Sequence, residues 1–356
     1  MTETRSASAE GTGLDVTVLV PVLDEEAHIR EAAAAMRAQR FEGTIEFLFI
    51  DGGSKDATRA LLEEIAREDP RVRLLENPAR RTPNALNIGL VHARGEYVAR
   101  MDAHTYYPAE YIRAGIERLR RGGVESVSGP QLAFGTDRWS RLIALALSTV
   151  LGTGGARSRR AMEEEIEVDT GFTGIWRRST LEAVGGWDEG WPNDQDFELA
   201  ARIRKAGGKI TCIPEMAARY VPRNSLPALV RQYARYGFYR VKTSRRHPES
   251  MRRSHVLPPA LTLTALVSAV GPRPLRRLAR LGLAAYALAL LRTSATAARS
   301  ADPREAAFLP AVFAAMHLSY GAGFFAGSLR FGPPLAALAH VAGIRRVEAR
   351  TPELRR

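Results

Sequence analysis

The sequence is poor in cysteine, and it lacks the glycine-rich motifs that most often bind phosphate. Cys212 is the single cysteine among 356 residues, so an intrachain disulfide is excluded, which fits a reducing compartment. No G-x-G-x-x-G motif follows the first predicted strand and no P-loop occurs. Residues 1–14 are polar without an apolar core, which predicts a disordered leader and excludes a signal peptide.

The charge balance is strongly basic. The formal net charge is +12, and nearly all of the positive charge is arginine. Such a balance favours anionic partners, namely phosphates, nucleic acid or an acidic lipid surface. With 45% hydrophobic residues, the chain can bury a sizeable core in one large domain or two smaller ones.

Apolar runs alternate with helical patterns through the first part of the chain. Buried strands are predicted at 16–22, 45–51, 72–77 and 96–102, with helices at 25–39, 54–69 and 83–95 between them. This order predicts an α/β fold with a doubly wound, mostly parallel sheet. Ligands of such sheets bind beyond the carboxyl ends of the strands, where Asp51 and Asp102 stand.

The C-terminal part changes character after the predicted α/β domain, 15–250. Uncharged stretches occupy 256–271, 281–291 and 306–329, and the last is long enough to span a bilayer. Arginines cluster at 273–280 and follow the third stretch at 330, 345 and 346. We expect membrane-associated helices at 251–332, with two spans and one interfacial segment, and a basic tail at 333–356. This arrangement would keep the α/β domain on the cytoplasmic side of the cell membrane. A soluble domain of buried helices is the alternative.

A candidate metal site follows the fourth predicted strand. The sequence "MDAH" places Asp102 and His104 two residues apart, and carboxylate oxygen and imidazole nitrogen both bind divalent cations. A cation there would neutralise a diphosphate. A turn aspartate beside a surface histidine is the alternative, which the position at a strand end disfavours. The glycines after Asp51 permit close backbone approach to a ligand.

Four motifs in order carry a resemblance to a known family. They are "VTVLVPVLDEE", "FLFIDGGSKDAT", "ALNIGLVHARGEYVARMDAH" and "WPNDQDFELAARIRKAGG", and together they resemble the family 2 glycosyltransferases with the GT-A fold over roughly residues 15–245. Within that family, "DAH" and "RQYARYGFYRVKTSRRHP" look most like the succinoglycan-type glucosyltransferases. Those are membrane-associated enzymes of bacterial exopolysaccharide assembly.

The resemblance implies a Rossmann-like GT-A fold and an inverting, metal-dependent hexosyltransferase. The implied donor is a nucleotide-diphosphate sugar, most often a UDP-hexose, and the acceptor is lipid-linked or a saccharide in cell-surface or exopolysaccharide synthesis. No nucleic-acid partner is implied. The matching donor-binding positions are Pro21, Val22, Leu23, Glu25, Asp51, Gly53 and Ala103.

Asp102 and His104 match the metal motif of the family, with His104 in place of a second aspartate. The cofactor would be Mn²⁺ or Mg²⁺, and the imidazole moves the expected preference toward Mn²⁺.

The catalytic base implied by the resemblance is Asp196. Inverting transfer needs a carboxylate that takes the proton from the acceptor hydroxyl. Gln195 stands where the family usually has glutamate, which removes a negative charge that would raise the pKa of the base, and Asp194 partly replaces it. Glu198 and Arg202 are four residues apart, which predicts an ordinary surface ion pair.

Further candidates lie on the diphosphate or acceptor side. Trp187 and Trp191 are equally compatible with stacking on sugar faces and with the core. The segment "RQYARY" resembles a Q-x-x-R-W motif with Tyr236 in place of tryptophan. Arg235, Arg240 and Lys242 are expected to reach the donor diphosphate, or to lie on anionic lipid.

Two other classes stay open from the residues alone. A nucleotidyltransferase would share the sheet and the carboxylates, but its basic glycine-rich loop is replaced here by the acidic "PVLDEE". A non-catalytic basic membrane or nucleic-acid binder would explain the charge without chemistry. Substrate-dependent release of a nucleoside diphosphate separates both classes from glycosyl transfer.

Overall fold

The computed structural model describes residues 14–300 and 302–344, so most of the predicted leader and the end of the basic tail lie outside the described residues. The main sheet has the strand order β3-β2-β1-β4-β9-β6-β10-β8. Its strands, in chain order, are β1 (Val16–Val22), β2 (Ile45–Asp51), β3 (Val72–Glu76), β4 (Tyr97–Arg100), β6 (Ser126–Ser128), β8 (Ile166–Glu167), β9 (Gly174–Arg177) and β10 (Ile210–Cys212). A small sheet joins β5 (Thr105–Tyr106), β11 (Ala218–Tyr220) and β7 (Gln131–Ala133).

The predicted mostly parallel α/β sheet is confirmed. Strand β1 pairs in parallel with both β2 and β4, and β2 pairs in parallel with β3. Strand β9 runs antiparallel between β4 and β6. Because β9 is reversed, the loop that precedes it lies at the same edge as the carboxyl end of β4, and this edge carries the site described below.

Helices cover both faces of the main sheet, because strand residues alternate between the faces. Val18 and Val20 point to the face covered by α1 (Ile29–Arg37), α2 (Thr58–Glu68) and α4 (Tyr111–Arg120). Leu19 points to the face covered by α3 (Thr82–His92), α7 (Arg178–Ala183) and α8 (Gln195–Lys205). Each fully buried valine or leucine contributes about 1.5–3 kcal/mol, so these alternating positions fix the register of the strands.

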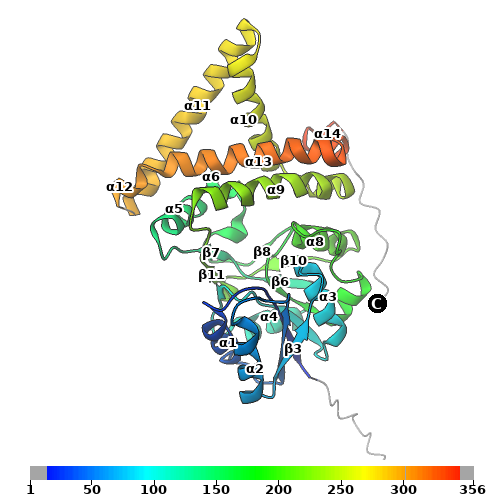
Figure 1. Ribbon diagram of the computed structural model, residues 1–356. Helices are drawn as coiled ribbons and strands as arrows, with labels where there is room; N and C mark the ends of the chain where they lie inside the picture. The colour runs from blue at the N-terminus through cyan, green and yellow to red at the C-terminus, as the bar shows by residue number, and fades with distance from the viewer. Residues whose placement is uncertain (1–13, 301, 345–356) are drawn as a thin grey trace, which may run out of the picture.

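A second layer of helices lies above the sheet (Figure 1). Helices α9 (Leu226–Arg246) and α13 (Leu309–Phe331) pack along each other, and α5 (Arg138–Leu147) and α6 (Val150–Thr153) lie beside them. Glycines make the contact close: a Cβ atom on Gly237 would lie 2.0 Å from the carbonyl oxygen of Tyr320, and one on Gly323 would lie 1.9 Å from that of Ala234. The two backbones therefore touch directly.

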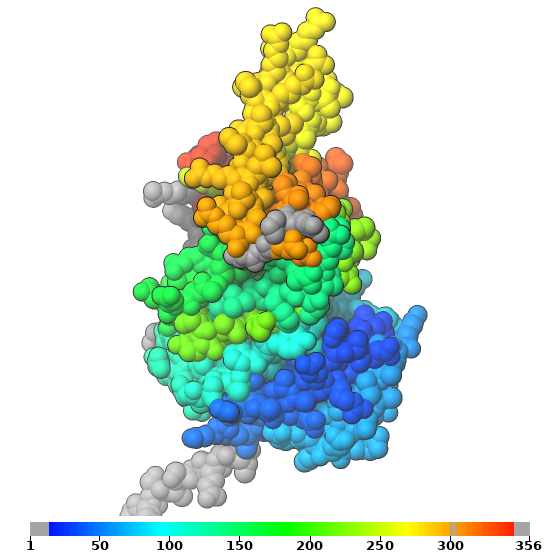
Figure 2. All heavy atoms as spheres, turned by 90° about the vertical axis from the view of Figure 1, so that its left-hand side faces the viewer, coloured from blue at the N-terminus to red at the C-terminus, as the bar shows by residue number. Residues whose placement is uncertain are grey.

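Helices α10 (Arg253–Val270) and α11 (Arg273–Ala297) form a hairpin that projects from the body (Figures 1 and 2). The remaining elements are the short helices α12 (Pro303–Ala306) and α14 (Leu335–Val341) and the 3₁₀ turns η1 (Arg157–Arg159), η2 (Pro214–Met216), η3 (Pro248–Ser250) and η4 (Ala298–Ser300).

The predicted membrane segments map onto these helices. In the described part of the chain, α13 alone is long and apolar enough to cross a membrane. The predicted span at 281–291 lies within α11, which does not meet that criterion. The segment predicted to lie in the interface, 256–271, forms most of α10.

Candidate active site

A cavity of about 1870 Å³ opens at the carboxyl edge of the sheet. Its floor includes Asp102 after β4 and Asp196 at the start of α8. From there it continues under α9 and between α10, α11 and α13. The strand order explains why these residues meet at the floor of the cavity. Strand β4 ends at this edge, and the reversed β9 brings the loop before it, which contains Phe172, to the same edge.

Arg100 joins the two acids that the sequence singled out. Its Nε lies 2.9 Å from Oδ1 of Asp102, and its Nη1 lies 2.7 Å from Oδ1 of Asp196. The arginine is 6% exposed, so both contacts are charge-assisted hydrogen bonds shielded from water. Arg100 ends β4, and Asp102 follows it in the loop. Arg100 is not among the predicted site residues, although a charge inside an otherwise apolar strand was a usable signal.

The two acids differ in their protonation. Burial, together with the negative charges of Asp102 and Asp194, raises the pKa of Asp196 to about 7 against the lowering effect of Arg100 and Arg159. At Asp102 burial also raises the pKa, but Arg100 and His104 outweigh it, so the pKa lies below its usual range. One carboxylate is therefore ionised near neutral pH and the other is poised to exchange a proton, which is the arrangement expected of a stabiliser and a general base.

Asp194 holds the start of α8 and supports the base. It caps the helix in a left-handed conformation, with φ of 66°, and its Oδ1 accepts a 2.7 Å hydrogen bond from Arg240 of α9. The predicted influence of Asp194 on the base is confirmed in direction, because its charge raises the pKa of Asp196. Arg240, which is 4% exposed, also lies over the ring of Phe197.

His104 stands at the cavity beside Glu25. The ring Nδ1 lies 3.2 Å from Oε1 of Glu25, and this contact, together with Asp102, raises the pKa of His104 against the opposing effects of burial and Arg223. Among residues 14–300 and 302–344, no group of three His, Cys, Asp or Glu side chains could by itself hold a metal. Asp102 and His104 supply two donors, and divalent cations that bind diphosphate commonly take few protein ligands and complete their shell with phosphate oxygens and water. The donor set therefore fits a cation that binds together with a diphosphate.

The predicted donor-binding residues lie at the ends of β1, β2 and β4. Glu25 and Ala103 line the cavity, and within the described residues its lining does not extend to Pro21, Val22, Leu23, Asp51 or Gly53. Asp51 is buried and accepts a 2.6 Å hydrogen bond from the Ser54 hydroxyl. Gly53 adopts a φ of 73°, which glycine tolerates without strain. The role of these residues in donor binding stays a prediction.

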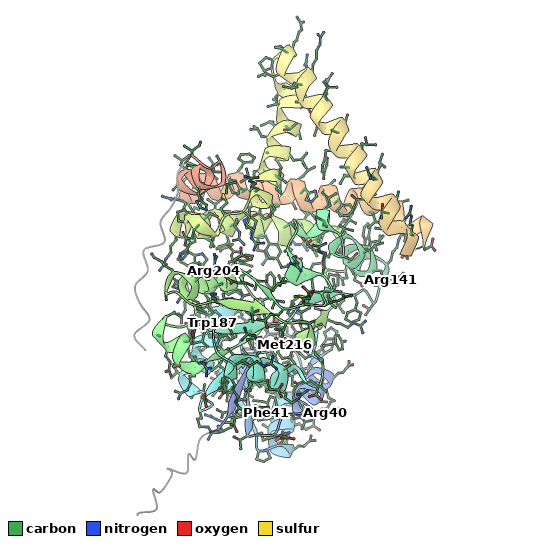
Figure 3. The ribbon with its side chains drawn as sticks, turned by 180° about the vertical axis from the view of Figure 1, so that it is seen from behind. Arg40, Phe41, Arg141, Trp187, Arg204 and Met216 are labelled. Carbon is green, nitrogen blue, oxygen red and sulfur yellow. The ribbon has the colours of Figure 1, made fainter. Side chains whose placement is uncertain are left out.

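The tryptophans do not lie where the stacking hypothesis places them. Trp187 is 1% exposed and packs edge-on against Trp176 in the core of the sheet domain. Figure 3 labels Trp187 in this position. Trp191 is 5% exposed, donates its indole N–H to Thr243 and is covered by Lys242. Neither ring lines the cavity, so the interpretation as sugar platforms is wrong and both tryptophans are core residues.

Two of the three predicted basic residues on α9 also lie away from the cavity. Lys242 donates a 2.6 Å hydrogen bond to the carbonyl oxygen of Gly190 and sits on Trp191. Arg235 is exposed and does not line the cavity, whereas Arg240 does. An α-helix turns by about 100° per residue, so successive basic residues of α9 face different directions and only one of these points inward.

The prediction that Glu198 and Arg202 form an ordinary surface ion pair is also wrong. Glu198 is fully buried, and it accepts 2.9 Å and 2.6 Å hydrogen bonds from Arg202. Nε2 of His247 lies 3.3 Å from Oε1 of Glu198, which also accepts the hydrogen bond from Nε of Arg202. Although burial raises the pKa of Glu198, these two partners lower it to about 2. The pair lies within α8 and is buried rather than on the surface, and the contact of Glu198 with His247 links α8 to the end of α9.

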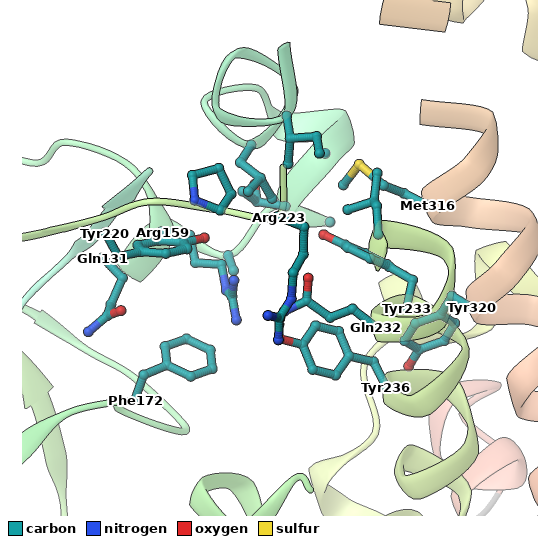
Figure 4. Close-up of a pocket in the computed structure, with 18 of the residues that line it drawn as sticks. Gln131, Arg159, Phe172, Tyr220, Arg223, Gln232, Tyr233, Tyr236, Met316 and Tyr320 are labelled. Carbon is teal, nitrogen blue, oxygen red and sulfur yellow. The ribbon is translucent and has the colours of Figure 1, made fainter. Parts of the chain in front are cut away.

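The upper part of the cavity is lined by residues that were not predicted as site residues (Figure 4). Arg159 and Phe172 face Gln232 and Tyr236 of α9 across this space. Gln232 and Tyr236 come from the motif that resembles Q-x-x-R-W, and they are joined by a 2.9 Å hydrogen bond. Arg159 lies in the short turn η1, where the sequence has no hydrophobic periodicity that would predict which way its side chain points.

Comparisons with known proteins define the class. The family model for glycosyl transferase family 2 matches residues 17–185. The chain is 32% identical over 243 residues to the succinoglycan biosynthesis protein ExoA of Rhizobium meliloti, covering 68% of this chain and 73% of that protein. The protein belongs to the family 2 glycosyltransferases and is an enzyme, which removes the non-catalytic and nucleotidyltransferase alternatives.

Two more comparisons bear on lineage and fold. The undecaprenyl-phosphate 4-deoxy-4-formamido-L-arabinose transferase of Pseudomonas aeruginosa is 31% identical over 144 residues, 38% of this chain and 42% of that protein. The crystal structure of TarS residues 1–349 from S. aureus, in complex with UDP-GlcNAc, superposes with a TM-score of 0.50 and 14% identity over 90% of this chain and 93% of that one. At this identity the likeness shows the fold alone, which is the predicted GT-A fold.

Proposed function

We propose that this glycosyltransferase moves a hexose from a nucleotide-diphosphate sugar, with a UDP-sugar as the first candidate, to a hydroxyl of a lipid-linked acceptor with inversion at the anomeric carbon. The observation that carries the proposal is the pairing of Asp102 and Asp196 across Arg100 on the floor of one cavity. An ionised acid beside a base with a pKa of about 7 suits a displacement in which the acceptor hydroxyl loses a proton and the donor diphosphate departs with negative charge.

In the proposed reaction, Asp196 takes the proton of the acceptor hydroxyl as its oxygen attacks the anomeric carbon. The bond from that carbon to the donor diphosphate breaks on the opposite face, so the configuration inverts and the nucleoside diphosphate leaves. Arg100 orients the carboxylate of Asp196, and Asp194 keeps its pKa high enough to accept the proton near neutral pH.

Asp102 and His104 would hold the divalent cation, Mn²⁺ or Mg²⁺. A bound cation would neutralise charge that develops on the departing diphosphate. Glu25 orients the His104 ring, and Arg223, which acts on the charge of His104, provides a further cation on this side of the cavity. The imidazole favours Mn²⁺ over Mg²⁺ in this proposal.

The proposed site of action is the cytoplasmic face of the cell membrane. Between Glu249 and Asp302 the sequence has eight arginines and no acidic residue. The hairpin of α10 and α11 also exposes large apolar side chains, with Leu266 58% and Leu281 68% exposed. Exposed leucines among arginines suit the interface of an anionic bilayer. Recovery of the intact protein in the aqueous fraction, without detergent and in the presence of anionic vesicles, would contradict this location.

A lipid-linked acceptor is supported by the same hairpin, because the cavity runs between its helices to the floor at Asp196. The relative from P. aeruginosa is named for an undecaprenyl phosphate substrate.

The test is a donor panel on the detergent-purified protein. UDP-, GDP- and dTDP-sugars are incubated with and without Mn²⁺, and release of the nucleoside diphosphate is measured with and without a lipid extract as acceptor. We expect release from one donor class, dependent on the cation and stimulated by the extract. Asp196→Asn should abolish transfer while donor binding remains, so normal turnover of that variant would remove the assignment of the base.

A further inference from the structure

Helix α13 packs against α9 from one end to the other. Leu229, near the start of α9, belongs to the same buried cluster as Phe313 of α13. Further along, the ring centre of Phe238 lies 5.0 Å from that of Phe331. Between these points the glycine contacts described above bring the two backbones together, and Figure 1 shows the helices side by side above the sheet. The two helices must therefore have the same orientation relative to any membrane.

Helix α9 is in turn bonded to the sheet domain. Arg240 donates a 2.7 Å hydrogen bond to Asp194 beside the base, and Arg246 donates a 2.8 Å hydrogen bond to Asp188. Six of the 21 residues of α9 are cationic and none is acidic. The six are Arg231, Arg235, Arg240, Lys242, Arg245 and Arg246.

This packing conflicts with a membrane span. Helix α13 has 23 residues and is about 35 Å long, which is close to the thickness of about 30 Å of the hydrocarbon core. If α13 crossed a bilayer, α9 would lie at the same depth, and its six cations and the adjoining edge of the sheet domain would enter the hydrocarbon. Charged side chains and unpaired backbone groups are costly there. The length of α13 suits a span, but its neighbour does not.

The face of α13 turned away from α9 is a continuous apolar stripe. It consists of the exposed residues Ala311, Leu318, Ala322, Phe325 and Leu329. Their spacing of seven, four, three and four residues places them on one side of a helix that turns by about 100° per residue. Arg330, at the end of α13, is the one charged residue among the exposed positions of this helix. An exposed apolar surface of this kind needs a partner.

The hairpin of α10 and α11 indicates which partner covers the apolar stripe. Helix α10 leaves the body beside the stripe, where the Thr262 hydroxyl lies 3.4 Å from the carbonyl oxygen of Leu318. The hairpin exposes leucines among arginines, so it extends the apolar surface and adds positive charge to it. An anionic bilayer surface matches both properties.

We infer that α13 lies in the plane of the membrane surface, with the apolar stripe at the boundary between headgroups and acyl chains, and that it does not cross the bilayer. The span predicted at 306–329 is replaced in this proposal by an interfacial helix. Both ends of α13 then remain on the side of the membrane that holds the sheet domain. The inference rests on the proposed location at the membrane and specifies how the protein meets it.

The first experiment locates the two ends of α13. Ala307→Cys lies before the helix, Ala336→Cys lies after it, and Ala60→Cys on α2 marks the side of the sheet domain, all at exposed positions. The native Cys212 is buried, so the wild type serves as the blank. Each variant is treated with a membrane-impermeant maleimide in inverted membrane vesicles, before and after detergent is added.

We expect all three cysteines to react to the same extent without detergent, and detergent to add nothing. A spanning α13 puts its ends on opposite sides, so one of the two end positions would react only after detergent. That result would overturn the inference.

The second experiment tests the apolar stripe. Leu329→Glu changes a residue that is 89% exposed, and the control Val91→Glu changes one on α3 that is 82% exposed, so neither removes a buried contact. Binding of the full-length protein to vesicles of phosphatidylcholine and phosphatidylglycerol is measured by flotation. Leu329→Glu should weaken binding about tenfold, whereas Val91→Glu should bind as the wild type does.

Wild-type binding of Leu329→Glu would also overturn the inference, because the stripe would then face something other than the bilayer, such as a protein partner. The proposed location fails separately, if the wild-type protein does not float with the vesicles at all.

Discussion

Replacing Arg100 by methionine tests the link between the two acids. The variant keeps the length of the side chain but removes the guanidinium that donates to Asp102 and Asp196. Asp196 then loses its strongest neighbouring positive charge while the charges of Asp102 and Asp194 remain. A hydrogen bond to a charged group is worth about 1.5–3 kcal/mol, and 1.36 kcal/mol corresponds to one pKa unit. The pKa of Asp196 should therefore rise by about one to two units.

The direction of the pH effect follows from the role of the base. Asp196 must be ionised to accept a proton, so a higher pKa moves the acidic limb of kcat/KM to higher pH. A carboxyl with a pKa of about 7 is about half ionised at pH 7, and with a pKa of about 8 to 9 only about a tenth to a hundredth is ionised. Transfer at pH 7 should fall about fivefold to fiftyfold and recover as the pH is raised toward about 10.

The assay is the pH profile of kcat/KM for sugar transfer, measured on the wild type, Arg100→Met and Arg100→Lys. Arg178→Met serves as the control, because it removes a partly exposed arginine whose ion pair with Glu182 lies outside the cavity. Arg100→Lys should give an intermediate profile. A uniform loss of activity, with the acidic limb at its wild-type position, would refute the conclusion that Arg100 sets the pKa of the base.

Three further predictions concern the metal, the core and the helix layer. His104→Asp should raise activity with Mg²⁺ relative to Mn²⁺, and an unchanged ratio would mean that the imidazole does not select the cation. Glu198→Gln should destabilise the fold by about 3 kcal/mol in denaturant unfolding at pH 7. Because the pKa of Glu198 is lowered from 4.5 to about 2, its contribution is complete above about pH 4.5 and is lost toward pH 2, so the gap between variant and wild type should narrow there. Gly323→Ala should lower the melting temperature, because the new Cβ would lie 1.9 Å from a carbonyl oxygen of α9. The control Gly282→Ala should not lower it, because the nearest atom to its new Cβ would be 3.7 Å away. Equal melting temperatures of the two variants would refute the close contact of α9 and α13.

Local patterns in the sequence predicted the first half of the sheet well. The expected strands at 16–22 and 45–51 coincide with β1 and β2, because each is a continuous apolar run buried on both faces. Later elements were harder to predict. Strand β9 is short and antiparallel, and its place between β4 and β6 depends on pairings between residues about 50 to 80 positions apart, which periodicity does not encode.

The floor of the site was predictable only in part. Asp102 and Asp196 come together as expected, because both belong to motifs at an edge that the fold class defines. Arg100 was hidden inside a strand that was interpreted as apolar. Arg159 reaches the cavity through the packing of η1 near α9, a long-range contact without a local signal. Trp187 shows the opposite error, since sequence alone does not distinguish a buried aromatic ring from one that stacks on a sugar.

The glycine contact between α9 and α13 limits how the enzyme can be divided. The predicted boundary at residue 250 falls after α9, so a fragment that ends there keeps α9 but loses α13, its main neighbour. Val241 and Gly237 would then face water, and Arg240, which pairs with Asp194 beside the base, would lose its rigid support. A fragment that ends at residue 250 is therefore expected to aggregate or to lose the order of its active site. In this enzyme the C-terminal helices are part of the catalytic body, and not a removable anchor.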